Sequence, residues 1–208
     1  MLVYIIRRLL WTPVLLALAA FFVFIMGTFA PGDPAELRLG NRATPERIER
    51  ERERLGLDRP IPVRYVQYIS DALRGDLGDS YQYQGKPVLE IITPRLWVSL
   101  QLNIAALIVA ITVGLPLGFY AAKKQGTAKD PTIVITMLIL YAMPVFFTAP
   151  FLILFFAVKL HWVPAAGWGG FFSLQIILPA LTIGIPGAAV FVRHMRASTL
   201  EIIGQEYV

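Results

Sequence analysis

The chain has 208 residues, of which 56% are hydrophobic, carries a formal net charge of +5 and contains no cysteine. This composition is too apolar for an ordinary soluble domain, and without cysteine the chain cannot form disulfides, iron–sulfur clusters or a thiol nucleophile. Residues 31–95 hold equal numbers of basic and acidic side chains, and no other segment gathers enough basic charge to bind a nucleic-acid backbone.

Four stretches of the chain contain no Asp, Glu, Lys or Arg, and these stretches predict membrane spans. A helix of about 20 residues crosses the roughly 30 Å hydrocarbon core of a bilayer. Each stretch is at least that long: Leu9–Ala30, Leu96–Ala122, Pro131–Val158 and Leu160–Val192. The Pro- and Gly-containing segment 164–170 interrupts the last one, so we expect that span to begin near Gln175. The sequence therefore predicts an all-α polytopic membrane protein with four transmembrane helices.

The first apolar stretch is too long for the apolar region of a signal peptide, which runs to about 7–15 residues, so we expect an uncleaved span. Basic residues flank the spans at positions that share one side of the membrane, and short basic links stay in the cytoplasm. We therefore expect a cytoplasmic N-terminus. The expected parts are the N-terminus with the first span, an external helical segment, and a transmembrane core: 1–30, 31–95 and 96–208.

Two short helices are expected in the external segment. Thr44 is a typical N-cap before Pro45, and Gly56 ends that helix. A second helix is expected over Pro62–Leu73, where Tyr65, Ile69 and Leu73 recur every fourth residue and form one apolar stripe. Alternating Glu and Arg residues in the first helix form either a solvated face or a surface that binds a partner. The candidate docking residues are Arg50, Arg52 and Arg54.

The spans contain no ionisable group, although ion-coupled transporters and pumps need such groups at membrane depth. Helix breakers and polar residues are frequent instead, and Tyr141-Ala142-Met143-Pro144 places a bulky ring beside a predicted bend. These residues either line and gate a passage or serve helix packing alone. The candidate path and gate residues are Tyr141, Met143, Pro144, Thr182 and Pro186.

The sequence contains no pattern typical of a catalytic site or a metal site. Its two histidines, His161 and His194, lie at opposite ends of the expected spans and cannot share a metal. No phosphate-binding Walker loop is present. We therefore expect no enzymatic activity and no cofactor bound by this chain, and energy for uphill transport would have to come from another subunit.

Short motifs distributed along the chain resemble the dipeptide, oligopeptide and nickel branch of the binding-protein-dependent ABC-transporter permeases. Each motif is weak alone, but their order and spacing cover nearly the whole chain. The motifs are Tyr4-Ile5-Ile6-Arg7-Arg8-Leu9-Leu10, Ala30-Pro31-Gly32-Asp33-Pro34, Ala43-Thr44-Pro45-Glu46, Leu55-Gly56-Leu57-Asp58-Arg59-Pro60, Arg74-Gly75-Asp76-Leu77-Gly78-Asp79-Ser80, Leu115-Pro116-Leu117-Gly118, Leu178-Pro179-Ala180-Leu181-Thr182 and Arg196-Ala197-Ser198-Thr199-Leu200-Glu201.

The resemblance implies a permease subunit of an ATP-driven importer in a bacterial inner membrane, working by alternating access. Its implied partners are a second homologous permease, two cytoplasmic ATPase subunits or domains that use ATP and Mg²⁺, an external solute-binding protein and membrane lipid. The family normally has six spans and a cytoplasmic coupling segment, and here we expect the body of that segment and the last two spans to be missing. The candidate coupling junction is Arg196, Glu201, Glu206 and Tyr207.

The sequence leaves the cargo open among dipeptides, longer peptides, glutathione-like peptides, nickel chelates and sugars, with peptides favoured by the resemblance. A passive channel, or a structural membrane subunit of a larger complex, is the alternative function. Stimulation of ATP hydrolysis by the solute-binding protein would distinguish an importer from either alternative.

Overall fold

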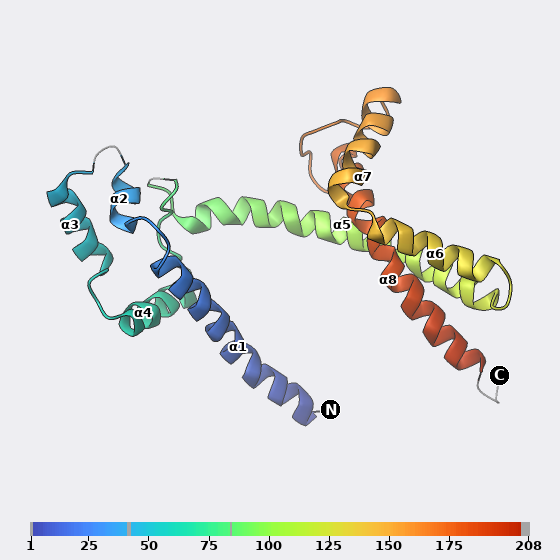
Figure 1. The fold of residues 1–208 in the computed structure, drawn as a ribbon, viewed down its shortest axis with the longest axis horizontal. Coiled ribbons are helices and arrows are strands. Elements are labelled where there is room, and N and C mark those ends of the chain that lie inside the picture. Colours follow the sequence, from blue (N-terminus) through green and yellow to red (C-terminus); the bar gives the residue numbers. More distant parts are fainter. Residues whose placement is uncertain (1, 41–42, 84, 205–208) are drawn as a thin grey trace. The chain divides into compact units, whose positions relative to one another are not determined.

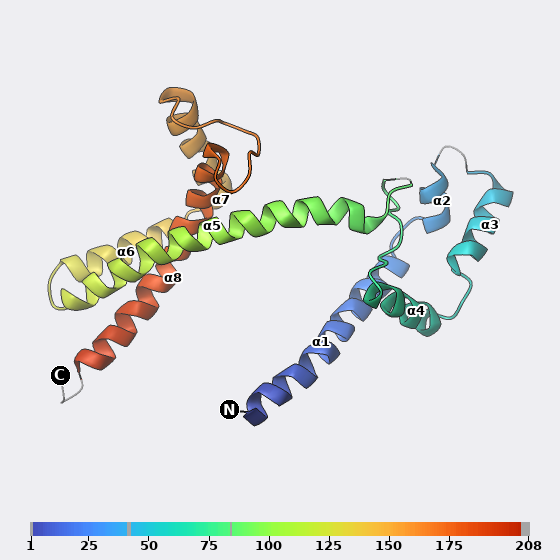
Figure 2. The same cartoon turned by 180° about the vertical axis from the view of Figure 1, so that it is seen from behind.

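The computed structural model describes residues 2–40, 43–83 and 85–204. Within that part of the chain the regular structure is helical, apart from one isolated antiparallel bridge between Asp79 and Pro87. The chain forms two compact units, Met1–Pro94 and Arg95–Val208 (Figures 1 and 2). The all-α polytopic class predicted from the sequence is confirmed.

The first unit contains one long apolar helix and three short ones. Helix α1 spans Leu2–Thr28, α2 spans Pro34–Leu39, α3 spans Pro45–Leu55 and α4 spans Ile61–Leu73. The two external helices expected from the sequence are present within one residue of their predicted bounds. Helix α2 was not predicted. It begins where the Asp33 carboxylate accepts a hydrogen bond from the backbone N–H of Ala35 at 2.9 Å.

The ends of α3 match the expected sequence signals except at its first cap. Pro45 occupies the first turn, and Gly56 ends the helix in the left-handed region at φ 64°. Thr44 holds the N-cap position in an extended conformation, but its side chain makes no capping hydrogen bond. Placement of Pro45 and Gly56, rather than the Thr44 hydroxyl, therefore accounts for where α3 begins and ends.

Ion pairs connect α2 with α3 and with the turn at residues 76–80. Arg38 pairs with Glu51 at 3.3 Å and also with Asp79. Arg52 reaches back to Asp33 at 3.5 Å. Some charged side chains of α3 therefore form ion pairs within the segment 31–95.

The second unit contains most of α5 and the helices that follow it. Helix α5 spans Val88–Lys123, beginning in the first unit, and is followed by α6 at Lys129–Ala142, α7 at Val145–Leu152 and a π-helical turn, η2, at Ile153–Lys159. A 3₁₀ turn, η3 at Leu174–Ile176, leads into α8 at Ile177–Ile203.

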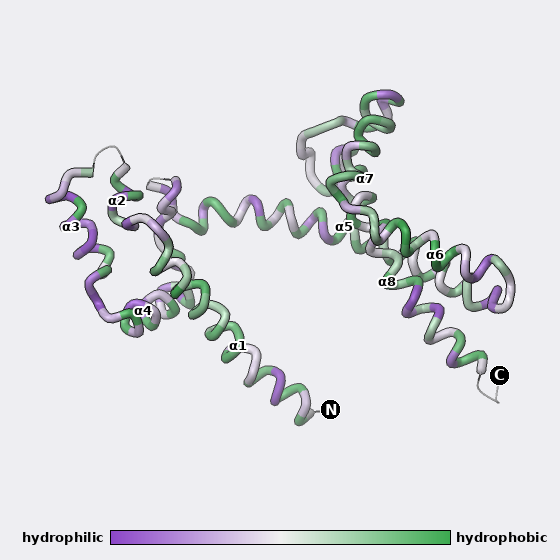
Figure 3. Tube along the Cα trace, in the orientation of Figure 1, coloured by the Kyte–Doolittle hydropathy of each residue, from purple (hydrophilic) through white to green (hydrophobic). Residues whose placement is uncertain are grey.

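Among the described residues, three helical segments are long and apolar enough to cross a membrane: Val3–Thr28, Val88–Lys123 and Leu174–Ile203. Figure 3 shows α1 as largely hydrophobic and α3 as largely hydrophilic. The expected third span is not one straight helix, since Lys129–Ala142 and Val145–Lys159 meet at an angle of 97°. The part of the chain that the structure describes offers a fourth candidate span only if this bent pair counts as one.

Helices α5 and α8 approach closely through small residues. A Cβ added to Gly118 would lie 2.6 Å from the carbonyl oxygen of Val192, and one added to Gly184 would lie 2.6 Å from that of Ala106. Gly114 lies equally close to α8. Only glycine permits this separation, because any Cβ would overlap the facing helix. Close packing of this kind stabilises helix association in lipid, where the hydrophobic effect does not drive it.

Candidate functional site

The bend between α6 and α7 lies inside an apolar segment, at two residues predicted as part of a gate. Met143 is extended at φ −70° and ψ 123°, and so is Pro144, the N-cap of α7, at φ −63° and ψ 136°. Pro144 has no N–H to donate, and an αR conformation at the residue before a proline is disfavoured. The pair therefore ends α6 and redirects the chain.

The bend interrupts the run of helical hydrogen bonds between α6 and α7. The carbonyl of Ile139 accepts the N–H of Met143 at 3.1 Å, whereas Pro144 accepts the N–H groups of Phe147 and Thr148. The last carbonyls of α6 have no helical turn after them to supply donors. Such backbone is tolerated at membrane depth where protein buries it or where it lines a wet cavity. Tyr141, one turn before the bend, has 55% of its surface exposed.

The two other candidate path residues lie in α8. Thr182 is buried at 6% exposure, and its hydroxyl donates to the carbonyl of Leu178 at 2.7 Å. This hydrogen bond within the helix satisfies the hydroxyl locally. Pro186 is half-buried inside the same helix, which continues through it to Ile203. Thr182 is thus held in helix packing, whereas the α6–α7 bend presents open backbone and an exposed ring.

A buried ion pair joins the start of α6 to the far end of α8. Arg196 donates from Nε and Nη2 to the two carboxylate oxygens of Asp130, at 2.6 Å each. Asp130 is 5% exposed, and the Arg196 side chain is about one-third exposed. A bidentate guanidinium–carboxylate contact fixes orientation as well as distance. The sequence predicts Arg196 at the coupling junction, whereas no sequence signal indicates Asp130.

The other candidate junction residues follow Arg196 along the chain. Glu201 is exposed in the last turn of α8, next to Ile202 and Ile203, which are also exposed. Glu206 and Tyr207 lie outside the described residues. The described junction therefore consists of the Asp130–Arg196 pair and an exposed final turn.

The three candidate docking arginines have different surroundings. Arg52 pairs with Asp33, and Arg54 pairs with Glu51 at 3.5 Å, so both contribute to ion pairs of the external segment. Arg50 is exposed, and no ion pair involves it in the described part of the chain. Of the three, Arg50 is the one whose charge points to solvent without an internal partner.

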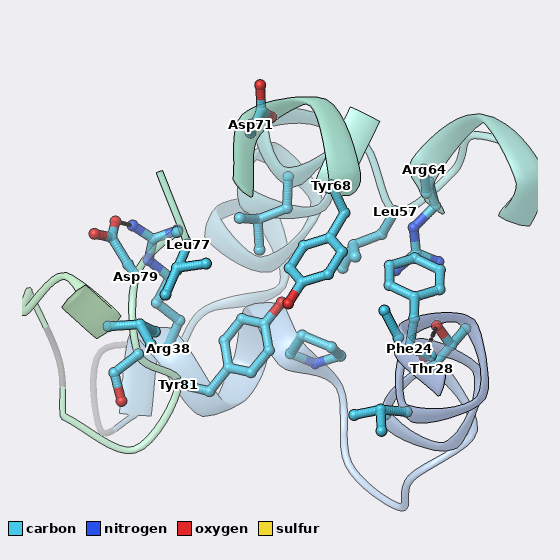
Figure 4. A pocket seen from close by; sticks show the side chains of 18 of the residues that line it. Phe24, Thr28, Arg38, Leu57, Arg64, Tyr68, Asp71, Leu77, Asp79 and Tyr81 are labelled. Carbon is cyan, nitrogen blue, oxygen red and sulfur yellow. Dashed lines mark hydrogen bonds and ion pairs between the residues drawn. The ribbon is translucent and has the colours of Figure 1, made fainter. Parts of the chain in front are cut away.

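A hollow of about 1220 Å³ opens in the first unit between α1, α4 and the segment around 76–82. Figure 4 shows Tyr68 and Tyr81 pointing toward one another across it, with Arg38 and Asp79 paired at one side. Arg64 stacks over the ring of Phe24, with the guanidinium carbon 5.7 Å from the ring centroid. Across residues 2–40, 43–83 and 85–204, no group of three His, Asp or Glu side chains could hold a metal ion.

Two family models match consecutive parts of the chain. Residues 1–103 match the N-terminal part of the binding-protein-dependent transport system membrane component, and residues 114–208 match the binding-protein-dependent transport system inner membrane component. The chain belongs to this family and is a permease subunit of an ABC importer.

Similar proteins carry names consistent with that family. The probable peptide ABC transporter permease protein y4tP of Sinorhizobium fredii is 36% identical, with 99% of this chain and 67% of the relative aligned. The glutathione transport system permease proteins GsiC of Shigella flexneri and of Escherichia coli K12 are 35% and 34% identical, with all of this chain and 67% of each relative aligned.

Proposed function

We propose that this permease subunit imports peptides by alternating access, with the α6–α7 bend as its gate and the inner end of α8 as its coupling junction. The observation that carries this proposal is the 97° bend at Met143–Pro144 within an apolar segment. Broken membrane helices lie at the substrate sites of many transporters, because the interrupted backbone offers polar groups without a charged side chain. Related permeases named for peptides and glutathione support a peptide cargo.

The Asp130–Arg196 pair supplies the mechanical connection in this proposal. Asp130 lies in the first turn of α6, and the last residue of α6 is directly followed by the bend. Arg196 lies near the cytoplasmic end that we propose for α8. A displacement of that end would pull on the first turn of α6 through two 2.6 Å hydrogen bonds. Coupling would thus reach the gate through one short, stiff helix, although Asp130 itself touches no cargo.

The remaining components of the transporter follow from this scheme. The partners are a second permease, two cytoplasmic ATPases that bind ATP and Mg²⁺, and an external solute-binding protein. The N-terminus lies in the cytoplasm, and the segment 31–95 faces the solute-binding protein, with exposed Arg50 as the best-placed docking residue. Glu201 in the final turn of α8 belongs to the junction, as do Glu206 and Tyr207, which the sequence places just beyond it.

Accessibility of Tyr141 tests the gate. The chain has no cysteine, so Tyr141→Cys introduces a single thiol. In the assembled complex, with no reactive cysteine in the other subunits, its labelling rate by an aqueous thiol reagent should change severalfold between nucleotide-free and ATP-trapped states. Leu15→Cys, on the exposed side of α1, is the matched control and should label equally slowly in both. Equal rates at Tyr141→Cys in a complex that still transports would refute the gate.

A further inference from the structure

Helix α4 contacts α1 through aromatic side chains. The ring of Tyr65 lies 5.1 Å from Phe21 and 5.7 Å from Phe24, measured between centroids, and Tyr68 lies 5.8 Å from Phe24. The Tyr65 hydroxyl also donates to the backbone carbonyl of Ala17. Figures 1 and 2 both show α4 beside α1. The contact therefore extends from Phe24 down to Ala17.

The depth of this contact follows from where α1 can cross the bilayer. Arg7 and Arg8 limit the apolar stretch at one end and Asp33 limits it beyond the other, and charges are costly in the hydrocarbon. A core of about 20 residues between these limits leaves little freedom. By the helical rise, Ala17 lies about 17 Å below Thr28. That distance places Ala17 near the middle of the bilayer and Phe24 within its outer half.

Three apolar side chains of α4 are largely exposed in the described part of the chain. Val66 is 66% exposed, Leu73 is 84% exposed and Val63 is half-exposed. Spacings of three and seven residues put these side chains on one side of the helix, away from the Tyr68 ring. Leu73, which the sequence places on one apolar stripe with Tyr65 and Ile69, is thus mostly exposed. In water such a surface would be unfavourable.

The opposite side of α4 is polar and faces the hollow. Arg64 and Asp71 both line it (Figure 4), together with Asp33, Arg38 and Asp79 of the external segment. Charged side chains at membrane depth need water or a partner, and a hollow of this volume has room for water. The helix thus has one side that borders this hollow, and another on which Val63 and Val66 are exposed beside Ser70 and Arg74.

We propose that α4 is embedded in the outer leaflet as an amphipathic helix. Its Val63–Val66–Leu73 surface contacts lipid acyl chains, and its Arg64–Asp71 side borders a water-filled hollow that descends below the outer membrane surface. The occupant is lipid because the contact with α1 fixes the depth of the helix. The inference rests on the α1–α4 contacts and holds whatever the cargo or the transport mechanism.

Fluorescence quenching tests this placement in the chain within its native complex, reconstituted in phosphatidylcholine nanodiscs. Val66→Cys, Leu73→Cys and Asp71→Cys are each labelled with bimane. Lipids carrying a nitroxide on the acyl chain should quench the first two strongly, and aqueous iodide should leave them unchanged. Asp71→Cys should show the reverse. Leu15→Cys on α1 is the lipid control, and Glu49→Cys on α3, exposed in the external segment, is the aqueous control.

Two results would overturn the proposal. Iodide quenching at Val66→Cys and Leu73→Cys, without lipid quenching, would place α4 in the aqueous phase outside the membrane. Protection of both positions from both quenchers would show that protein covers this surface. Measuring two positions on the same face guards against a local effect of one substitution, and thermal unfolding of each variant confirms that the complex is intact.

Discussion

The Asp130–Arg196 ion pair is the contact to which we assign the coupling of α8 to α6. Asp130→Asn removes the negative charge of the pair. Arg196→Lys keeps the positive charge but cannot make the bidentate contact. Each change should lower the stability of the complex by about 1.5–3 kcal/mol, the range for hydrogen bonds to charged groups. Each should also lower the amount of cargo moved per ATP hydrolysed. Thermal unfolding and the ratio of uptake to hydrolysis measure the two effects.

The charge-swapped variant Asp130→Arg with Arg196→Asp distinguishes a specific pair from general packing. If the pair transmits movement, the swap should recover part of the uptake-to-hydrolysis ratio that either single reversal loses. Single variants that are destabilised yet keep the normal ratio would mean that the pair holds the fold without coupling it.

Asp130 shows what the sequence could not predict at this scale. It is the one acidic residue in a lysine-containing link, and a solvated link is the natural interpretation of such a segment. Its partner lies 66 residues away in α8, and no local pattern indicates a contact at that separation. The helix caps at Pro45 and Gly56 were predictable because their determinants are adjacent in the chain.

The packing of α5 against α8 should be disrupted by adding a single methyl group at a contact glycine. Gly184→Ala would place Cβ 2.6 Å from the Ala106 carbonyl oxygen and 2.7 Å from Val109 Cβ. Because a backbone atom cannot yield locally, the helices must separate. We expect lower thermal stability and reduced transport.

Gly187→Ala is the matched control in the same helix. Its Cβ would meet only Ala110 Cβ at 3.5 Å, an ordinary contact. The substitution should be neutral, or stabilising by up to about 1 kcal/mol through helix propensity. Equal destabilisation by Gly184→Ala and Gly187→Ala would show that the α5–α8 packing does not depend on the short contact.

We predict that α3 binds the solute-binding protein through Arg50. Arg50→Glu should weaken binding of the solute-binding protein in a salt-sensitive manner, while leaving thermal stability unchanged. Arg52→Glu is the comparison, because it breaks the pair with Asp33 and should also loosen the external segment. Titration of the solute-binding protein against the reconstituted complex measures both. Unchanged binding by Arg50→Glu would make α3 an ordinary solvated helix.

The elements were predictable where a period or a breaker lies within one segment. Apolar stretches identified α1, α5 and α8, and Pro144 indicated a bend. The 97° angle and the contact of Tyr65 with Ala17 were not predictable, because they depend on how separate helices pack. Sequence patterns likewise gave Tyr65, Ile69 and Leu73 one stripe, whereas Leu73 is exposed.

For the whole molecule, the expected membrane orientation is the first prediction. Basic residues beside α1, α5 and α8 favour a cytoplasmic N-terminus and an external segment 31–95. A membrane-impermeant thiol reagent added to intact cells should label Ser80→Cys and should leave Thr127→Cys unlabelled until the cells are opened. The absence of native cysteine keeps the background low. External labelling of Thr127→Cys would invert the topology.

We propose that this chain moves peptide cargo only when ATP hydrolysis and a solute-binding protein drive it. The most direct measurement is uptake of a labelled mixture of short peptides into proteoliposomes that contain the complex with this chain as its permease subunit. ATP and Mg²⁺ are enclosed, and the solute-binding protein is added outside. We expect peptide uptake against a concentration gradient, and we expect this uptake to stop when either ATP or the solute-binding protein is omitted. If peptide still enters down its gradient when ATP and the solute-binding protein are both omitted, the chain is a passive channel and not an ATP-driven importer.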